Sequence, residues 1–166
     1  MDRSILYLVI SVITAGLIVS CNFTEDQVDA KSTTHTGFDS VRAVKLGADQ
    51  YGMKKYVMAF LYRGSNRDLD SAKAMELQMA HLENIGRMAE EGKLALAGPF
   101  LDTGDLRGIY IFNVETVEEA KALTETDPAI QAKSLVMELK PWYGSAALVE
   151  VNEIHKTLSK KEVTEQ

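Results

Sequence analysis

Residues 92–119, GKLALAGPFLDTGDLRGIYIFNVETVEE, contain two strand patterns joined by a tight turn. The first pattern, Leu94–Phe100, is apolar and is interrupted near its end by a Gly-Pro pair, and the second, Gly108–Glu115, is rich in β-branched and aromatic residues. Between them, Asp102–Asp105 has the composition of a turn. The stretch therefore predicts a β-hairpin.

A helix and a further strand are predicted after this hairpin. Thr116 and Glu119 form a capping box, in which each side chain can satisfy a backbone N–H at the helix start, and a short helix is predicted to about Thr126. Asp127-Pro128 then begins another helical turn, with Asp127 as N-cap and Pro128 at the first helical position. Ser134–Lys140 is the last strand, which we expect Pro141 to end.

A strand and a long helix are predicted before the hairpin. Lys55–Tyr62, KYVMAFLY, is the strand. N-cap residues at Asp68–Ser71 then begin a helical pattern that runs to Gly92. The complete order is strand, helix, strand, strand, helix, strand. This order predicts an α+β domain of the ferredoxin-like split βαβ (βαββαβ) type, with an extra C-terminal segment.

Two of the predicted strands are apolar on both faces. Val57–Leu61 and Ile109–Phe112 show no polar alternation, although a sheet with helices on one side normally has one wet face. A second copy of the chain would cover the other face, which predicts a homodimer. The alternative cover is the segment Ser145–Leu158, whose apolar residues have helical spacing.

The chain begins with an uncharged apolar run, Ile5–Val19, which follows Arg3 and ends just before the single cysteine, Cys21. A charged start, an apolar middle and small residues before a cleavage point are the layout of an export signal. Residues 18–21 resemble the lipobox of bacterial lipoproteins, which implies cleavage before Cys21 and acylation of that cysteine. The alternatives are an uncleaved membrane anchor, for which the run is short, and an ordinary signal peptide. Lipidation predicts attachment to the bacterial cell envelope, at the outer membrane if the source is Gram-negative, because Asn22 follows the cysteine.

Composition divides the chain into four segments. They are a signal peptide at 1–20, a flexible polar tether at 21–53, a folded domain at 54–144, and a C-terminal helix with a charged tail at 145–166. The net charge of −6 without basic clusters gives no reason to expect a nucleic-acid partner. A single cysteine excludes a disulfide within the chain.

An ordered set of short motifs resembles the YciI-like (YCII-related) family. The motifs are His81-Leu82, Gly92-Lys93-Leu94, Ala97-Gly98-Pro99-Phe100, Gly108 with its strand, Glu118-Glu119-Ala120 and Thr126-Asp127-Pro128. The resemblance covers about residues 54–143 and implies a ferredoxin-like domain that dimerises through its sheets into a barrel. It also implies a catalytic pair formed by His81 and Asp127.

A His–Asp pair is suited to general acid–base chemistry. Histidine titrates near neutrality, and a carboxylate on one ring nitrogen fixes the tautomer and stabilises the imidazolium. Such a pair fits proton abstraction next to a carbonyl, isomerisation or elimination, and hence a lyase or isomerase acting on a small organic molecule. Without the resemblance, His81 reads as a core residue on an apolar helix stripe, and Asp127 as a simple cap.

Other candidates concern ligand binding. Arg63 can bind an anionic substrate group, Pro99 belongs to a strand break beside the predicted site, and Trp142 can wall a pocket. We expect no metal site, because neither His35 nor His155 has a partner at ligand spacing, and no cofactor. The alternative to an enzyme is a lipid-anchored module that binds a small molecule without transforming it. Haem-binding and cofactor-free oxygenase functions, known among other barrel-forming dimers of this fold, are a weaker alternative.

Overall fold

The computed structural model describes residues 37–161, so the predicted signal peptide and Cys21 lie outside the described residues. The elements follow one another as α1 (Ser40–Leu46), β1 (Met53–Arg63), α2 (Ser71–Glu90), β2 (Leu94–Pro99), β3 (Leu106–Phe112), α3 (Val117–Thr124), α4 (Pro128–Gln131), β4 (Leu135–Ser145), the 3-10 helix η1 (Ala146–Glu150) and α5 (Val151–Leu158). Among the helices of residues 37–161, none combines the length and the hydrophobicity of a membrane span.

The four strands form one antiparallel sheet in the order β2-β3-β1-β4. The central strand β1 places Val57 opposite Phe112 of β3 and opposite Pro141 of β4. This strand order, with the helices in the connections, is that of the ferredoxin-like split βαβ fold. The predicted fold class is therefore confirmed.

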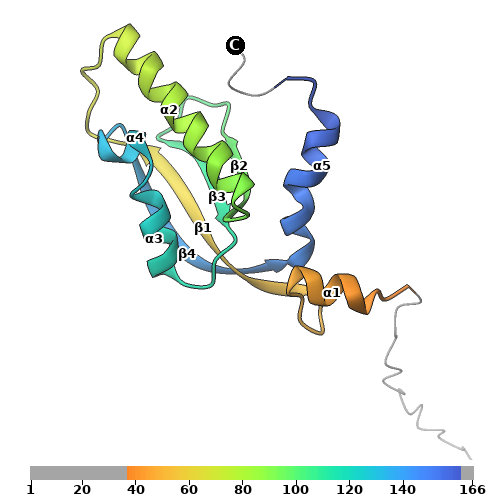
Figure 1. Cartoon of the computed structure of the whole chain (residues 1–166). Coiled ribbons are helices and arrows are strands. Elements are labelled where there is room, and N and C mark those ends of the chain that lie inside the picture. Colours follow the sequence, from red (N-terminus) through yellow and green to blue (C-terminus); the bar gives the residue numbers. More distant parts are fainter. Residues whose placement is uncertain (1–36, 162–166) are drawn as a thin grey trace, which may run out of the picture. The chain divides into compact units, whose positions relative to one another are not determined.

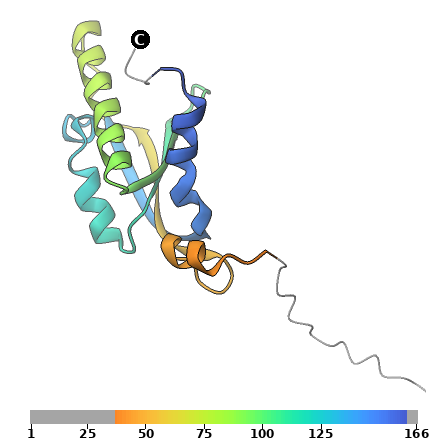
Figure 2. The same cartoon turned by 45° about the vertical axis from the view of Figure 1, so that its right-hand side comes forward.

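Helices α2 and α3 cover one face of the sheet, as Figures 1 and 2 show. The side chains between the helices and this face form the main hydrophobic core. Its buried members are Val57, Ala59, Leu61, Met88, Leu94, Tyr110, Phe112, Val114 and Ala120. Removing a large apolar side chain of this kind from water contributes about 1.5–3 kcal/mol, so this layer supplies most of the drive to fold.

The predicted helix starts are present. The Asp70 side chain accepts from the Lys73 N–H at 2.8 Å, which caps α2. At α3, Thr116 Oγ1 accepts from the Glu119 N–H at 3.2 Å, while the Glu119 carboxylate accepts from the Thr116 N–H at 3.1 Å. This reciprocal arrangement is the predicted capping box.

The second face of the sheet is covered only in part by the chain itself. Tyr56, Ala95 and Ile111 are buried there, and Leu148 and Val149 of η1 pack against them. Figure 2 shows α5 on the side of the sheet opposite to α2 and α3. The predicted C-terminal helix is thus present, but its apolar stripe is not fully buried, since Ile154 and Leu158 are 54% and 74% exposed.

Helix α1 lies in the segment that the sequence analysis assigned to a flexible tether. The Asp39 side chain accepts from the Arg42 N–H at 2.9 Å, and Gly47 ends the helix in the left-handed conformation at φ 70°. The Arg42 side chain forms an ion pair with Glu150 of η1, which ties α1 to the C-terminal segment. The folded part therefore begins before residue 54, because local caps outweighed the polar composition.

The prediction that Pro141 ends the last strand is wrong. Strand β4 continues to Ser145, with Pro141 paired to Val57 and Trp142 to Tyr56. Because β4 is an edge strand, a proline can lie within it at a position whose missing N–H would have faced outward rather than toward β1.

Candidate functional site

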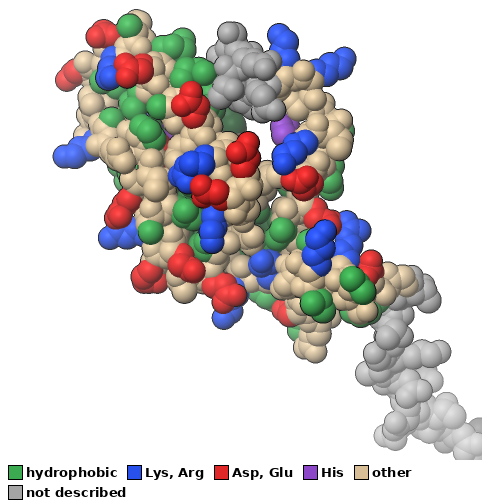
Figure 3. Space-filling model, in the orientation of Figure 1, with side chains coloured by type: hydrophobic (Ala, Val, Ile, Leu, Met, Phe, Trp, Pro, Cys, Tyr) green, Lys and Arg blue, Asp and Glu red, His purple; other side chains and the backbone are tan. Residues whose placement is uncertain are grey.

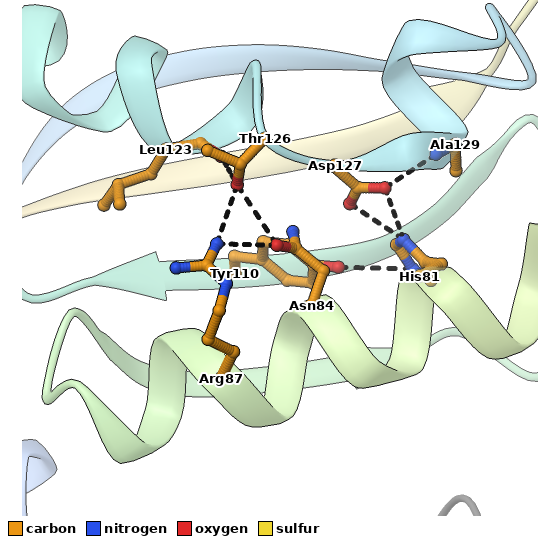
Figure 4. Close-up of polar contacts among 8 residues, drawn as sticks. All are labelled: His81, Asn84, Arg87, Tyr110, Leu123, Thr126, Asp127 and Ala129. Atoms are coloured by element: carbon orange, nitrogen blue, oxygen red, sulfur yellow. Dashed lines mark hydrogen bonds and ion pairs between the residues drawn. The ribbon is translucent and has the colours of Figure 1, made fainter.

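His81 lies on the buried face of α2 and contacts Asp127 directly. The His81 Nδ1 atom is 2.8 Å from Asp127 Oδ2 and 3.0 Å from Oδ1, and Figure 4 shows the two side chains pointing toward each other. His81 is 7% exposed and Asp127 is fully buried. The predicted hydrogen bond between them is therefore present, in a setting shielded from water.

The Asp127 carboxylate serves two partners. As the N-cap of α4, the carboxylate accepts a hydrogen bond from the Ala129 N–H at 2.8 Å. It also accepts one from the His81 ring. Pro128 follows at the first helical position, where its missing N–H costs nothing. The cap predicted from sequence thus also holds the carboxylate in place for the histidine.

Tyr110 completes a three-residue chain that the sequence analysis did not predict. Its hydroxyl is 3.2 Å from His81 Nε2, and the two rings are stacked with centroids 6.2 Å apart. Burial, and after it the Asp127 charge, raises the pKa of Tyr110, so the phenol keeps its proton. In the sequence Tyr110 is one aromatic residue of an apolar strand, and no local signal separates it from core residues such as Phe112.

These contacts favour one arrangement of protons. A carboxylate only accepts, so His81 Nδ1 donates to Asp127, and in that tautomer Nε2 has the lone pair that accepts from the Tyr110 hydroxyl. A proton added at Nε2 would form an imidazolium that the Asp127 charge stabilises. The chain can therefore store or pass a proton, with both ring nitrogens of His81 engaged at rest.

A second polar cluster lies one helical turn further along α2. The Asn84 side-chain oxygen accepts from Arg87 at 2.7 Å and from the Thr126 hydroxyl at 3.1 Å (Figure 4). Asn84 is buried, and its side-chain Nδ2 has no hydrogen-bond partner among the described residues. The cluster links α2 to the segment just before Asp127. In the sequence, Asn84 lies in an otherwise regular helical pattern, and no local signal distinguishes it.

The structure separates the predicted ligand-binding residues. Arg63 lines a pocket of about 320 Å³ at one end of the sheet. Pro99 ends the edge strand β2 and pairs with Gly108. Trp142 lies on the second face of the sheet, where its ring packs 5.8 Å from that of Tyr56. Neither Pro99 nor Trp142 lines this pocket or a larger one of about 530 Å³ beside α3 and β4, and the same holds for His81 and Asp127.

Within residues 37–161, no group of three or more His, Cys, Asp or Glu side chains is placed to hold a metal ion. His81 does have a carboxylate partner, Asp127, but the two side chains form a hydrogen bond with each other.

Sequence comparison places the chain in a family. The profile of the YCII-related domain matches residues 56–143, which is just over half of the chain and runs from within β1 to within β4. The chain belongs to the YCII-related domain family. The matched residues include His81, Asp127 and Tyr110, so the entire three-residue chain lies within the YCII-related domain.

Two similar proteins give further comparison. The uncharacterized protein YjpA of Bacillus subtilis (strain 168) is 33% identical over 63 residues, which cover 37% of this chain and 71% of YjpA. The solved structure of 5-chloro-2-hydroxyhydroquinone dehydrochlorinase (TftG) from Burkholderia phenoliruptrix AC1100, in complex with 2,5-dihydroxybenzoquinone, aligns with a TM-score of 0.39 and 22% identity. The alignment covers 52% of this chain and 92% of TftG.

Proposed function

We propose that this YCII-related protein is a small acid–base enzyme, of the lyase or isomerase type, in which His81 and Asp127 transfer a proton on a small organic molecule. The observation that carries the proposal is the buried hydrogen bond between His81 Nδ1 and Asp127. It supplies what general acid–base catalysis needs, namely a titratable ring with a fixed tautomer and a partner for its charged form.

Tyr110 sets a condition on this chemistry. Its hydroxyl occupies His81 Nε2, the nitrogen that would exchange a proton with substrate. The phenol either relays that proton or moves aside when substrate binds. In both cases Asp127 stays on Nδ1 and stabilises the imidazolium.

Hydrogen–deuterium exchange can detect this activity before the natural reaction is known. A metabolite library is first screened against the full-length protein by thermal shift, because a ligand stabilises the folded state. Each compound that binds is then incubated with the protein in D2O, and proton NMR follows the loss of C–H signals next to carbonyl groups. We expect His81→Gln to slow exchange by about 10²–10⁴-fold, the usual contribution of a general acid or base.

A matched histidine serves as control for this experiment. His155→Gln changes an exposed histidine on α5, at a distance in sequence from the pair, and should leave exchange at the wild-type rate. Exchange that is equally fast in the His81→Gln protein would contradict the enzyme proposal. Circular dichroism and the melting temperature show whether the buried substitution has left the fold intact.

The second candidate function is a ligand-binding module without catalysis. One observation favours it: both ring nitrogens of His81 already have partners, and neither His81 nor Asp127 lines the two pockets described above. Compounds that stabilise the protein but undergo no exchange or conversion in its presence would support this alternative.

We further propose that Cys21 is acylated and anchors the protein in the bacterial cell envelope, at the outer membrane in a Gram-negative source. The support is the order Ile18, Val19, Ser20, Cys21 after an apolar run. Expressed with a radiolabelled fatty acid, the wild-type chain should incorporate label, and Cys21→Ser should remain an unlabelled precursor. The control Ser20→Ala keeps a small residue before the cysteine and should be labelled. Full labelling of Cys21→Ser would contradict the proposal.

We also propose that two copies of the chain pair through the second face of the sheet. Phe60 and Ile109 are only half-buried there, and Val136 is 52% exposed. Pairing would remove these apolar side chains from water.

A further inference from the structure

We propose that the pocket lined by Arg63, Arg67 and Arg107 binds the carboxylate of a small organic acid, which would make an organic anion the substrate class of the enzyme proposed above. The inference rests on that proposed function, because it places the substrate beside the His81–Asp127 pair. The pocket lies at the end of the sheet where β1 finishes and β3 and β4 begin, under the first turns of α2. It is lined by Arg63, Asn66, Arg67, Leu69, Ala74, Leu77, Gln78, Arg107, Ala129, Ser134 and Leu135.

The lining carries three positive charges and no negative one. Arg67 has no hydrogen bond or ion pair within the described part of the chain. Arg63 Nε lies 3.9 Å from a carboxylate oxygen of Asp105, a side chain that is 91% exposed, and this contact neutralises little. The Arg63 guanidinium also donates long hydrogen bonds to the backbone oxygens of Gly104 and Thr103, at 3.4 and 3.5 Å, which leave its charge in place. Arg107 donates to the backbone oxygens of Asp102 and Gly104 at 3.1 and 3.2 Å, which orients its guanidinium without neutralising it.

This concentration of positive charge contrasts with the net negative charge of the protein. The protein has a net charge of −6, and Figure 3 shows acidic and basic side chains interspersed over the face that carries α2 and α3. Three arginines and no carboxylate line this pocket, so the pocket is a local site for an anion. A guanidinium presents a planar fork of N–H donors that matches a carboxylate, and such charge-assisted bonds are stronger than neutral ones.

The rest of the lining suits an organic body rather than a bare inorganic ion. Leu69, Leu77 and Leu135 provide apolar walls, and Asn66 and Gln78 provide neutral polar groups. The volume of about 320 Å³ is at the small end of the range for ligand sites. An acid with a compact carbon skeleton fits this combination of size and chemistry.

Two wall residues connect the pocket to the His–Asp pair. Leu77 lies on α2 one turn before His81, so both side chains project from the same side of the helix. Ala129 lines the pocket, and its N–H donates to the Asp127 carboxylate at 2.8 Å. These two residues separate the pocket from the buried pair, so a substrate whose acid group the arginines hold would have to displace part of this wall to reach His81.

Calorimetric titration of the full-length protein in detergent tests the site with phthalate as the probe. We expect phthalate to bind, and neutral phthalamide of the same shape not to bind. Arg63→Gln and Arg67→Gln should each weaken the phthalate Kd roughly tenfold or more, the usual effect of losing a charge-assisted hydrogen bond. Lys73→Gln is the matched control: it removes one positive charge from the exposed side of α2, outside the pocket, and should leave the Kd unchanged.

Several results would overturn the inference. The first is that the arginine variants bind phthalate as tightly as the wild type. The second is that phthalamide binds as tightly as phthalate. The third is that inorganic phosphate binds as tightly as phthalate, a result that would exclude a site specific for carboxylates. The D2O exchange experiment keeps the two proposals apart. If phthalate binding depends on the arginines but D2O exchange does not depend on His81, only the enzyme proposal is refuted. If His81 is needed for exchange on a neutral compound and phthalate binding does not depend on the arginines, only the carboxylate-site inference is refuted.

Discussion

The two faces of the sheet are built from the same four strands, but they are covered in different ways. One face is closed by α2 and α3 and contains both the main core and the Asp127–His81–Tyr110 chain. The other face is covered by η1 and α5 over only part of its area. In Figure 3 the α5 segment stands apart from the helices of the first face, with a gap between them.

This difference shows where each kind of interaction can be placed. A buried polar chain needs fixed partners on several elements, and the first face supplies α2, β3 and α4 within hydrogen-bond distance of one another. The second face has polar groups at its rim, where Glu138 and Lys140 of β4 form an exposed ion pair. Its remaining apolar area is suited to contact with another surface.

The largest expected effect compares two phenylalanines on opposite faces. Phe112 is fully buried in the main core, whereas Phe60 on the second face is half-buried. Phe112→Ala should lower the free energy of unfolding by about 3–5 kcal/mol, because it leaves a cavity that the core cannot refill. Phe60→Ala should cost clearly less in the monomer. Urea denaturation of both variants, at a protein concentration where the chain is monomeric, measures the difference, and equal losses there would contradict the unequal cover of the two faces.

The next prediction concerns pairing through the second face. If two copies meet there, Ile109→Glu places a charge in the interface and should raise the dimer dissociation constant about a hundredfold or more, because a buried unpaired charge is costly. Sedimentation of the full-length protein in density-matched detergent gives the assembly state at micromolar concentration. Glu83→Lys, an exposed change on α2, serves as control and should not alter it. A wild-type protein that is monomeric at this concentration would rule out the pairing.

The smallest expected effect is a pH dependence that arises on the first face. Burial raises the pKa of Tyr110 above its ordinary value of 10, so the folded protein keeps the phenol neutral while the unfolded chain begins to ionise at pH 10. The stability that depends on the neutral phenol is fully present below pH 10 and is lost as the pH rises above it. Tyr110→Phe should therefore reduce the alkaline loss of stability by about 1.4 kcal/mol per pH unit.

Urea denaturation at a series of pH values above 10 checks this slope. Tyr51→Phe is the matched control, because Tyr51 is 76% exposed and its substitution removes no buried phenol. If the two variants have the same slope as the wild type, the raised pKa of Tyr110 is refuted. At neutral pH, Tyr110→Phe should also cost about 1–3 kcal/mol, since it leaves His81 Nε2 buried without a partner.

Sequence by itself determined the features that neighbouring residues encode. The order of strands and helices follows from hydrophobic periodicity, and the starts of α2, α3 and α4 follow from Asp70, the Thr116–Glu119 box and Asp127. The approach of His81 to Asp127 was predicted only through the family resemblance. Residue patterns alone predicted that His81 is a core residue and that Asp127 is a helix cap. Both descriptions hold, and the two side chains are also hydrogen-bonded to each other.

Tertiary structure alone decided which distant side chains meet. Tyr110 is 29 residues from His81, and their contact depends on the register of β3 and on the position of α2 above it. Arg63 and Arg107 converge on one pocket because β1 and β3 are antiparallel neighbours, while Trp142 faces the other way. The same dependence on position explains Pro141, which is tolerated because β4 lies at the edge of the sheet. Strand order and register are long-range properties, and no short window of the sequence contains them.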